Sequence, residues 1–159
     1  MTWARVALSV LLAVGGCRAT PPATTTFTAE DERAVRAIDS VFVAAWLRDD
    51  TTGVMNTLAP DAVLLPAGQQ PLTTPNAIRA FWWPSDSSHT RILTFDRAID
   101  EVGGEANTAW MRRTDSLTFT YAKGGTTSQA TSRSMSLAVL RRQPDGSWRF
   151  SRVMWGNRK

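Results

Sequence analysis

Hydrophobic and polar positions alternate over residues 90–156 in the manner of β-strands. These segments are rich in Thr, Val, Leu, Phe and Trp, which suit a pleated surface. Turn-forming residues interrupt the pattern at Gly103-Gly104, Gly124-Gly125 and Pro144-Asp145-Gly146, because glycine tolerates positive φ and proline presets φ. The pattern predicts four long antiparallel strands joined by three tight turns. Strands of this length twist, which gives the sheet a concave face.

A helical pattern precedes the strands and predicts a cover for that concave face. Apolar residues recur at intervals of three and four between Ala34 and Trp46, after a capping sequence at Thr28–Asp31. The polar residues of this helix, Asp39 among them, are expected mostly on the opposite side. A short helix is expected over residues 51–58 and a strand over 61–65. A third helix is expected over 74–83, with a threonine cap followed by proline.

The first residues have the layout of an export signal. An apolar run over residues 6–14 follows one basic residue and is far shorter than the roughly 20 residues that span a bilayer. The sequence Val14-Gly15-Gly16-Cys17 resembles the bacterial lipobox, whose cysteine is lipid-modified. We therefore expect a lipoprotein signal peptide over residues 1–17, a Thr/Pro tether over 18–27 and a folded domain over 28–157, on the periplasmic side of the cell envelope. The alternative is an ordinary signal peptide with an incidental Cys.

Charge and composition exclude several classes of function. The net charge is +4, and the basic residues are scattered without a run of five or six like charges, so nucleic-acid binding is not expected. One Cys and one His are too few for a zinc site of the usual type. Phosphate-loop and dinucleotide fingerprints are also missing from the sequence. We therefore expect no metal and no cofactor.

The order of the expected elements resembles the nuclear transport factor 2-like superfamily, and within it the SnoaL-like and ketosteroid-isomerase-like proteins. The resemblance rests on Asp50 at the first helix break, Pro66-x-Gly68, and the motifs at residues 58–62, 76–81, 145–149 and 154–157. The resemblance implies an α+β fold: a cone in which three N-terminal helices pack on a curved, mostly antiparallel sheet around an apolar pocket. It places seven side chains near that pocket: Phe42, Trp46, Leu65, Phe81, Trp82, Trp110 and Trp155. The alternative for each Trp is ordinary core packing.

The same resemblance identifies the positions that carry catalysis in ketosteroid isomerases, which use a carboxylate base with a Tyr and a protonated Asp as donors. These positions are Pro66 for the base, and Phe42 and Ala138 for the donors. None of the three side chains ionises, which implies a non-catalytic domain that binds a small apolar or amphipathic molecule. One alternative is a SnoaL-like acid–base enzyme (an isomerase, cyclase or dehydratase) that uses Asp115 or His89 on a polyketide- or steroid-like substrate. Another is a dimeric structural module.

Polar residues on the second and last long strands are further candidates for ligand contacts. If Trp110 faces the pocket, alternation along the strand turns Arg112 inward as well, where it could bind a carboxylate or phosphate. The opposite parity turns Arg113 and Asp115 inward instead. The family position of Trp110 favours the first parity. Arg152 is a second candidate, and a surface ion-pair ladder is the alternative for this whole set.

A second alternating pattern, of larger apolar residues with small ones, indicates whether the protein associates with a second copy. Met135, Leu137 and Val139 alternate with smaller residues on one strand. If the small residues line the pocket, the larger ones lie on the outer face of the sheet, and an exposed apolar face favours a partner. Because family members often dimerise through this face, we expect a homodimer.

Overall fold

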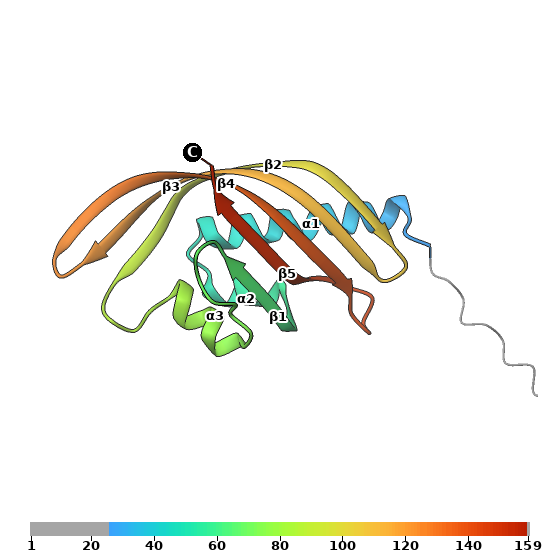
Figure 1. Cartoon of the computed structure of the whole chain (residues 1–159), viewed down its shortest axis with the longest axis horizontal. Helices are drawn as coiled ribbons and strands as arrows, with labels where there is room; N and C mark the ends of the chain where they lie inside the picture. The colour runs from blue at the N-terminus through green and yellow to red at the C-terminus, as the bar shows by residue number, and fades with distance from the viewer. Residues whose placement is uncertain (1–25, 159) are drawn as a thin grey trace, which may run out of the picture.

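The computed structural model describes residues 26–158, so the expectations for residues 1–25, including lipidation of Cys17, lie outside the described residues. The elements are α1 (Ala29–Leu47), α2 (Thr51–Asn56), β1 (Leu58–Pro66), α3 (Pro75–Trp82), β2 (His89–Glu105), β3 (Thr108–Lys123), β4 (Thr126–Arg142) and β5 (Trp148–Asn157). They form one sheet in the order β1-β5-β4-β3-β2, in which β1 and β5 are parallel and the other pairs are antiparallel. The sheet arches over α1 (Figure 1), which confirms the expected α+β cone.

Local capping explains where the helices begin. The Thr28 hydroxyl accepts a hydrogen bond from the Asp31 N–H at 3.2 Å, and the Asp31 carboxylate accepts one from the Thr28 N–H at 3.0 Å. Thr74 caps α3 ahead of Pro75 at its first position. Each cap satisfies backbone donors that a helix leaves free. The strand expected over 61–65 is longer, from Leu58 to Pro66, because it pairs with β5 at Leu58 and again from Val63 to Pro66, with an irregularity between the two stretches.

The first expected turn lies elsewhere. Gly103 and Gly104 belong to β2, and the chain reverses at residues 106–107, where Ala106 adopts φ of 50°. The two glycines instead make room for aromatic rings. A Cβ at Gly103 would lie 2.3 Å from Cζ2 of Trp110, and one at Gly104 would lie 2.5 Å from Cδ2 of Phe27. The other two turns are confirmed: Gly124-Gly125 and Gly146 all have positive φ.

The packed core lies between α1, α3, β1 and the concave face of the sheet. It consists of Val35, Leu58, Ala62, Leu64, Ile78, Ala109, Met111, Ala138, Leu140, Trp148 and Phe150. All of these side chains are at most 5% exposed, so the hydrophobic effect acts on each at nearly full strength. No helix within residues 26–158 has the length and apolar content needed to span a membrane.

Asp31 joins the start of α1 to the last hairpin. Its carboxylate accepts hydrogen bonds from the guanidinium of Arg142 and, at 3.4 Å, from Nε1 of Trp148. The Arg142 guanidinium also lies 4.7 Å from the Trp148 ring centroid. The pKa of Asp31 is lowered from 3.8, mainly by the hydrogen bond from the Thr28 N–H. Burial acts in the opposite direction, and the hydrogen bonds from the side chains of Arg142, Thr28 and Trp148 lower the pKa further.

We predict that Asp31→Asn destabilises the domain by about 2 kcal/mol at pH 7, because charge-assisted hydrogen bonds are lost. The folded-state pKa is below the unfolded value, so the contribution of Asp31 is complete above 3.8 and declines as pH falls through the folded pKa. Urea unfolding at several pH values measures this. Glu30→Gln, an exposed change in the same helical turn, is the control. An equal loss at pH 7 and well below pH 3 would contradict the prediction.

Candidate functional site

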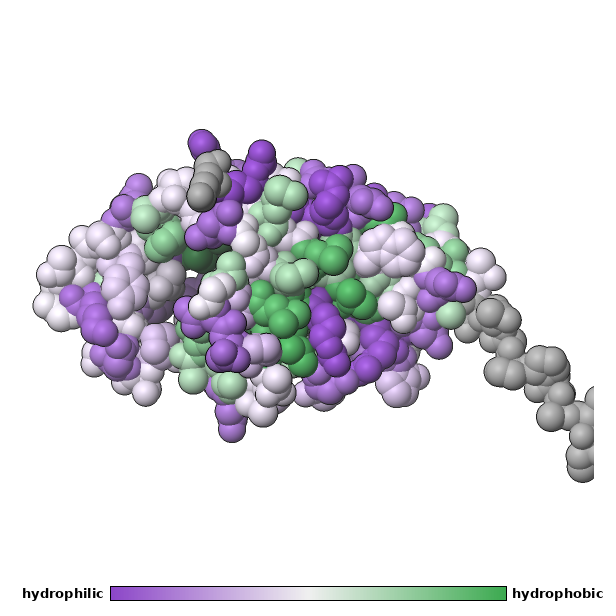
Figure 2. Space-filling model, viewed as in Figure 1, coloured by the Kyte–Doolittle hydropathy of each residue, from purple (hydrophilic) through white to green (hydrophobic). Residues whose placement is uncertain are grey.

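A cavity of about 370 Å³ lies beneath the arch of the sheet, next to the packed core. Helices α1 and α3 and the concave faces of β2 to β5 form its walls. It is lined by Phe42, Trp46, Leu58, Phe81, Trp82, Thr90, Ile92, Phe95, Arg97, Arg113, Asp115, Leu117, Phe119, Ser132, Ser134, Ser136, Phe150, Val153 and Trp155. Figure 2 shows the molecule hollowed between the arching strands and the helices. The volume is within the range of small-molecule sites.

Aromatic rings make up most of the apolar wall, and Phe42 lies at their centre. Its ring contacts Trp46, Trp82, Phe95 and Phe150 edge-on, with centroid separations of 6.2, 6.3, 6.3 and 5.5 Å. Edge-to-face packing of this kind is favourable beyond its buried area. Through these contacts Phe42 joins rings from α1, α3, β2 and β5 into one apolar wall.

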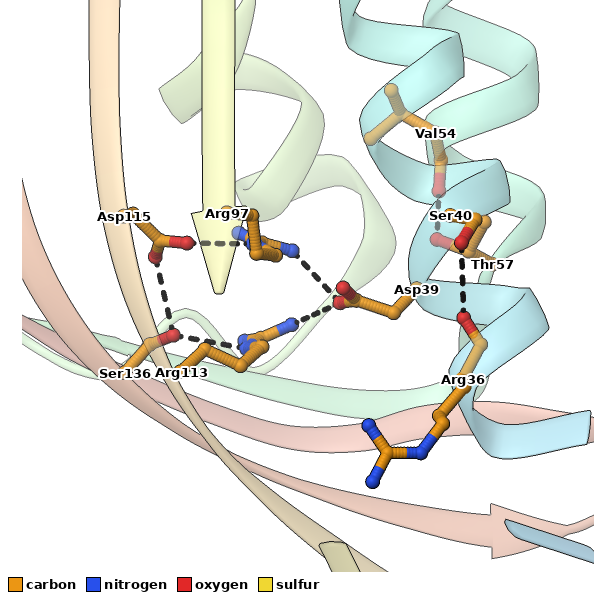
Figure 3. Close-up of polar contacts among 9 residues, drawn as sticks. All are labelled: Arg36, Asp39, Ser40, Val54, Thr57, Arg97, Arg113, Asp115 and Ser136. Atoms are coloured by element: carbon orange, nitrogen blue, oxygen red, sulfur yellow. Dashed lines mark hydrogen bonds and ion pairs between the residues drawn. The ribbon is translucent and has the colours of Figure 1, made fainter. Parts of the chain in front are cut away.

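A network of charged side chains forms the polar end of the cavity (Figure 3). Oδ1 of Asp39 on α1 accepts hydrogen bonds from Nη1 of Arg97 at 2.8 Å and Nη1 of Arg113 at 2.7 Å. Nε of Arg97 donates to Oδ1 of Asp115 at 2.6 Å. The Ser136 hydroxyl accepts from Nε of Arg113 at 3.0 Å and donates to Oδ2 of Asp115 at 3.3 Å. We call these five residues the Asp39 network.

The register of the sheet brings the strand residues of this network together. Arg97 on β2 lies directly opposite Asp115 on β3, and Arg113 lies directly opposite Ser136 on β4. Neighbouring strands are about 4.8 Å apart, so side chains on the same face meet. Asp39 reaches them from the face of α1 that covers the sheet, four residues after the buried Val35.

The Asp39 network is almost sealed from solvent. Asp39, Arg113 and Asp115 are 3%, 2% and 5% exposed. The pKa of Arg113 is lowered to about 10, first by burial and then by the charge of Arg97, while Asp39 and Asp115 act in the opposite direction. Arg113 therefore remains positively charged at neutral pH. Aromatic faces support the guanidinium groups, since that of Arg97 lies 4.4 Å from the Phe95 centroid and that of Arg113 lies 5.3 Å from the Phe150 centroid.

This arrangement offers hydrogen-bond donors but no free acid or base. Both carboxylates are engaged by arginine, and the Ser136 hydroxyl is held between Arg113 and Asp115. His89 is half exposed, lies 3.2 Å from the Asp49 carboxylate and does not line the cavity. Within residues 26–158, no three His, Cys, Asp or Glu side chains gather closely enough to hold a metal ion.

Five of the eight side chains expected at the pocket lie along the cavity: Phe42, Trp46, Phe81, Trp82 and Trp155. Three expectations are corrected. Trp110 and Arg112 point to the outer face and are exposed, and Leu65, which pairs with the outward Met154, lines a shallow groove on that face. The three residues at the catalytic positions of the isomerases lie in the cavity wall or the interior, and none of them can ionise. Phe42 lines the cavity, and Pro66 and Ala138 are buried.

The expected parity of β3 is wrong because Trp110 packs over Gly103 on the outer face of the neighbouring strand. Arg112 then meets acids there: its Nη1 lies 3.0 Å from Asp100 and its Nε lies 3.5 Å from Glu101. This is the surface ion-pair ladder that was the alternative. Arg152 is also directed outward, where it donates to backbone oxygens of β1 and β5.

Sequence reasoning missed Asp39 and Arg97 altogether. Asp39 was expected on the solvent side of α1, yet it lies between Val35 and Phe42 on the covered face. The signal was present, since an acid four residues after one apolar position and three before another shares their helical face. Arg97 lies two residues after Phe95 and two before Ile99. Side chains two apart on a strand point to the same face, so this spacing indicates that Arg97 points inward with its apolar neighbours.

The outer face of the sheet carries exposed apolar side chains. Trp110, Met135, Leu137 and Met154 are 40%, 43%, 42% and 51% exposed. Leu137 lies directly opposite Met154, and together with Leu65 these residues border the shallow groove. On β4, Ser134 and Ser136 are buried on the concave side, as the alternation of that strand predicts.

Comparison with solved structures identifies similar folds. A ketosteroid isomerase-like protein from Erwinia carotovora atroseptica is 20% identical with a TM-score of 0.69, over 83% of this chain and 99% of that one. A conserved protein from Planctomyces limnophilus is 18% identical with a TM-score of 0.64, over 82% and 100%. A protein of unknown function from Methylobacillus flagellatus, described as nuclear transport factor 2-like, is 12% identical with a TM-score of 0.62, over 86% and 99%.

These identities establish the fold and leave the activity open. No curated protein matches the sequence. The family described as the SnoaL-like domain matches residues 40–150, from the middle of α1 into β5. The matched region contains the strand residues of the Asp39 network and nearly all of the cavity wall. The chain belongs to the SnoaL-like domain family, within the nuclear transport factor 2-like fold.

Proposed function

We propose that this domain binds a small amphipathic organic molecule in the cavity, without catalysing its conversion. The observation that supports this best is the pairing of an aromatic hollow with a polar end whose acids are all engaged by arginine. A ligand is enclosed by apolar walls, while donors at one end fix its orientation. A domain of this kind stores, delivers or senses its ligand.

An acid–base enzyme has less support. Asp115 is held 2.6 Å from Arg97 and also receives the Ser136 hydroxyl, so proton abstraction would have to break a buried ion pair. His89 lies at the start of β2 beside Asp49, away from the cavity lining. A general base has to reach the proton that it removes, and neither residue is arranged for that.

The pocket is tested with N-phenyl-1-naphthylamine, an uncharged probe whose fluorescence rises in apolar surroundings. We expect saturable binding to the purified protein and, at a hundredfold excess over the Kd, a stabilisation of about 2.7 kcal/mol against urea. Ser134→Phe places a ring on the cavity wall and is expected to weaken binding at least tenfold. Ser128→Phe, on an exposed part of the same strand, is the control. Unaltered binding by the Ser134 variant, or no saturable binding, would contradict the proposal.

We also propose that the protein forms a homodimer through the outer face of the sheet. Exposed Trp110, Leu137 and Met154 would be removed from water by a second copy, and each such burial is favourable by a few kcal/mol at most. Light scattering at increasing concentration is expected to give twice the chain mass of 17.5 kDa, and the Leu137→Lys variant is expected to be monomeric. Thr127→Lys, exposed on the same strand, is the control. A wild-type monomer at all concentrations would refute this interface.

We further propose that lipid on Cys17, which lies outside the described residues, tethers the domain to a bacterial envelope membrane. The sequence Val14-Gly15-Gly16-Cys17 and the Thr/Pro segment after it support this. When the full chain is expressed with export, Cys17→Ser is expected to move the protein from the membrane fraction to the soluble periplasmic fraction. Membrane association that survives the substitution would refute the lipid anchor.

A further inference from the structure

The charges at the polar end of the cavity cancel. Two guanidinium groups, those of Arg97 and Arg113, meet two carboxylates, those of Asp39 and Asp115. Arg97, Arg113 and Asp115 line the cavity, and Asp39 pairs with both arginines without being part of the lining. Within residues 26–158, no other charged side chain lines the cavity. The ligand therefore meets a site that is strongly polar and carries no net charge.

This charge balance is fixed by the fold. Asp39 lies on α1, Arg97 on β2, and Arg113 and Asp115 on β3. The hydrogen bonds between them hold each side chain against a partner from another element. The ion-pair distances of 2.6 to 2.8 Å leave no room for an incoming anion between the partners. A ligand carboxylate would have to add its charge to a site whose cations are already neutralised. Removing an ion from water without a compensating charge is strongly unfavourable.

Hydrogen-bond donors nevertheless remain. Each arginine has five N–H groups, and the network uses only those on Nε and Nη1. The Nη2 atoms of Arg97 and Arg113 have no hydrogen-bond partner among the described residues and are not fully buried. Because both side chains line the cavity, these atoms keep a small accessible area at its wall. The Ser134 hydroxyl also lines the cavity and likewise has no hydrogen-bond partner among the described residues.

We infer that the cavity selects uncharged, ring-bearing molecules with a carbonyl or similar acceptor oxygen, which Arg97 and Arg113 bind, and that it discriminates against carboxylates. The inference rests on the proposed binding function and specifies its ligand class. It also replaces the expectation that an arginine in this pocket binds an anion: Arg112 lies outside the cavity, and the arginines inside it are neutralised.

Two probes with the same ring system test the selectivity: 2-acetylnaphthalene, which is a neutral ketone, and 2-naphthoate, its carboxylate counterpart. Equilibrium dialysis at pH 7.5 is expected to give at least tenfold tighter binding of the ketone. The carbonyl stretch of the bound ketone is expected at lower wavenumber than in hexane, because a guanidinium donates to it. Equal or tighter binding of naphthoate, or an unshifted carbonyl band, would overturn the inference. If N-phenyl-1-naphthylamine binds while this selectivity is missing, the binding function survives and only the ligand class fails.

A preference for the ketone could arise from the balanced charges of the site or only from the lower polarity of the probe. A variant that changes the charge balance separates the two causes. Asp115→Asn keeps the shape of the network and leaves one positive charge unneutralised. The affinity ratio of the two probes is then expected to move at least tenfold toward naphthoate. Asp100→Asn makes the same change in net charge on the outer face beside Arg112 and is expected to leave the ratio unchanged. Melting curves verify that both variants fold, and Asp39→Asn provides the same test from the helix. A ratio that is insensitive to Asp115 and Asp39 would contradict the charge-balance mechanism.

Discussion

The buried ion pairs between α1 and the sheet are the constraint on which the rest of the structure depends. Asp39 receives both arginines through one carboxylate oxygen, so the helix has one position over β2 and β3 at which every charge has a partner. Burying four charges is costly, and the loss of one partner from such a set typically destabilises a protein by about 3–5 kcal/mol. The network therefore specifies where α1 lies on the sheet, which an apolar contact alone would specify less strictly.

The same network separates a packed interior from a hollow one. Along α1, the buried Val35 precedes Asp39, and the cavity residues Phe42 and Trp46 follow it. Along β3, the buried Met111 precedes Arg113, and Leu117 on the cavity wall follows. On one side, aliphatic side chains together with Trp148 fill the space between helix and sheet. On the other side, large aromatic rings contact one another edge to edge and leave the space between them open.

Much of the fold could be predicted from the sequence, because the helix caps and strand periodicity are local signals. Thr28 and Thr74 mark helix starts by hydrogen bonds within three residues, and Gly124-Gly125 marks a turn by backbone conformation alone. Gly103-Gly104 gave a false turn, because the need for glycine there comes from the rings of Trp110 and Phe27. Contacts between separate segments are invisible to a local pattern.

The candidate site was harder to predict for the same reason. Aromatic residues such as Phe42 and Trp46 lie on a helical stripe and could be assigned to the pocket. The parity of β3 depends on which side of the sheet Trp110 packs, and a one-residue change in parity exchanges Arg112 for Arg113. The spacing of Asp39 to Val35 and Phe42 indicates its helical face, but it does not identify Arg97 and Arg113 as the residues that pair with it. Ionic partners 58 and 74 residues apart along the chain leave no local sequence signal.

A double-mutant cycle on Asp39→Asn and Arg113→Met tests the central claim most directly, because it isolates the coupling between the helix and the sheet. Urea unfolding of the wild type, both single variants and the double variant provides the four free energies. The account predicts a coupling of about 2 kcal/mol or more, as expected for a charge pair removed from water. The exposed pair of Asp86 and Lys123 is the comparison and is expected to show no measurable coupling. A coupling for Asp39 and Arg113 no larger than that of the exposed pair would contradict the account.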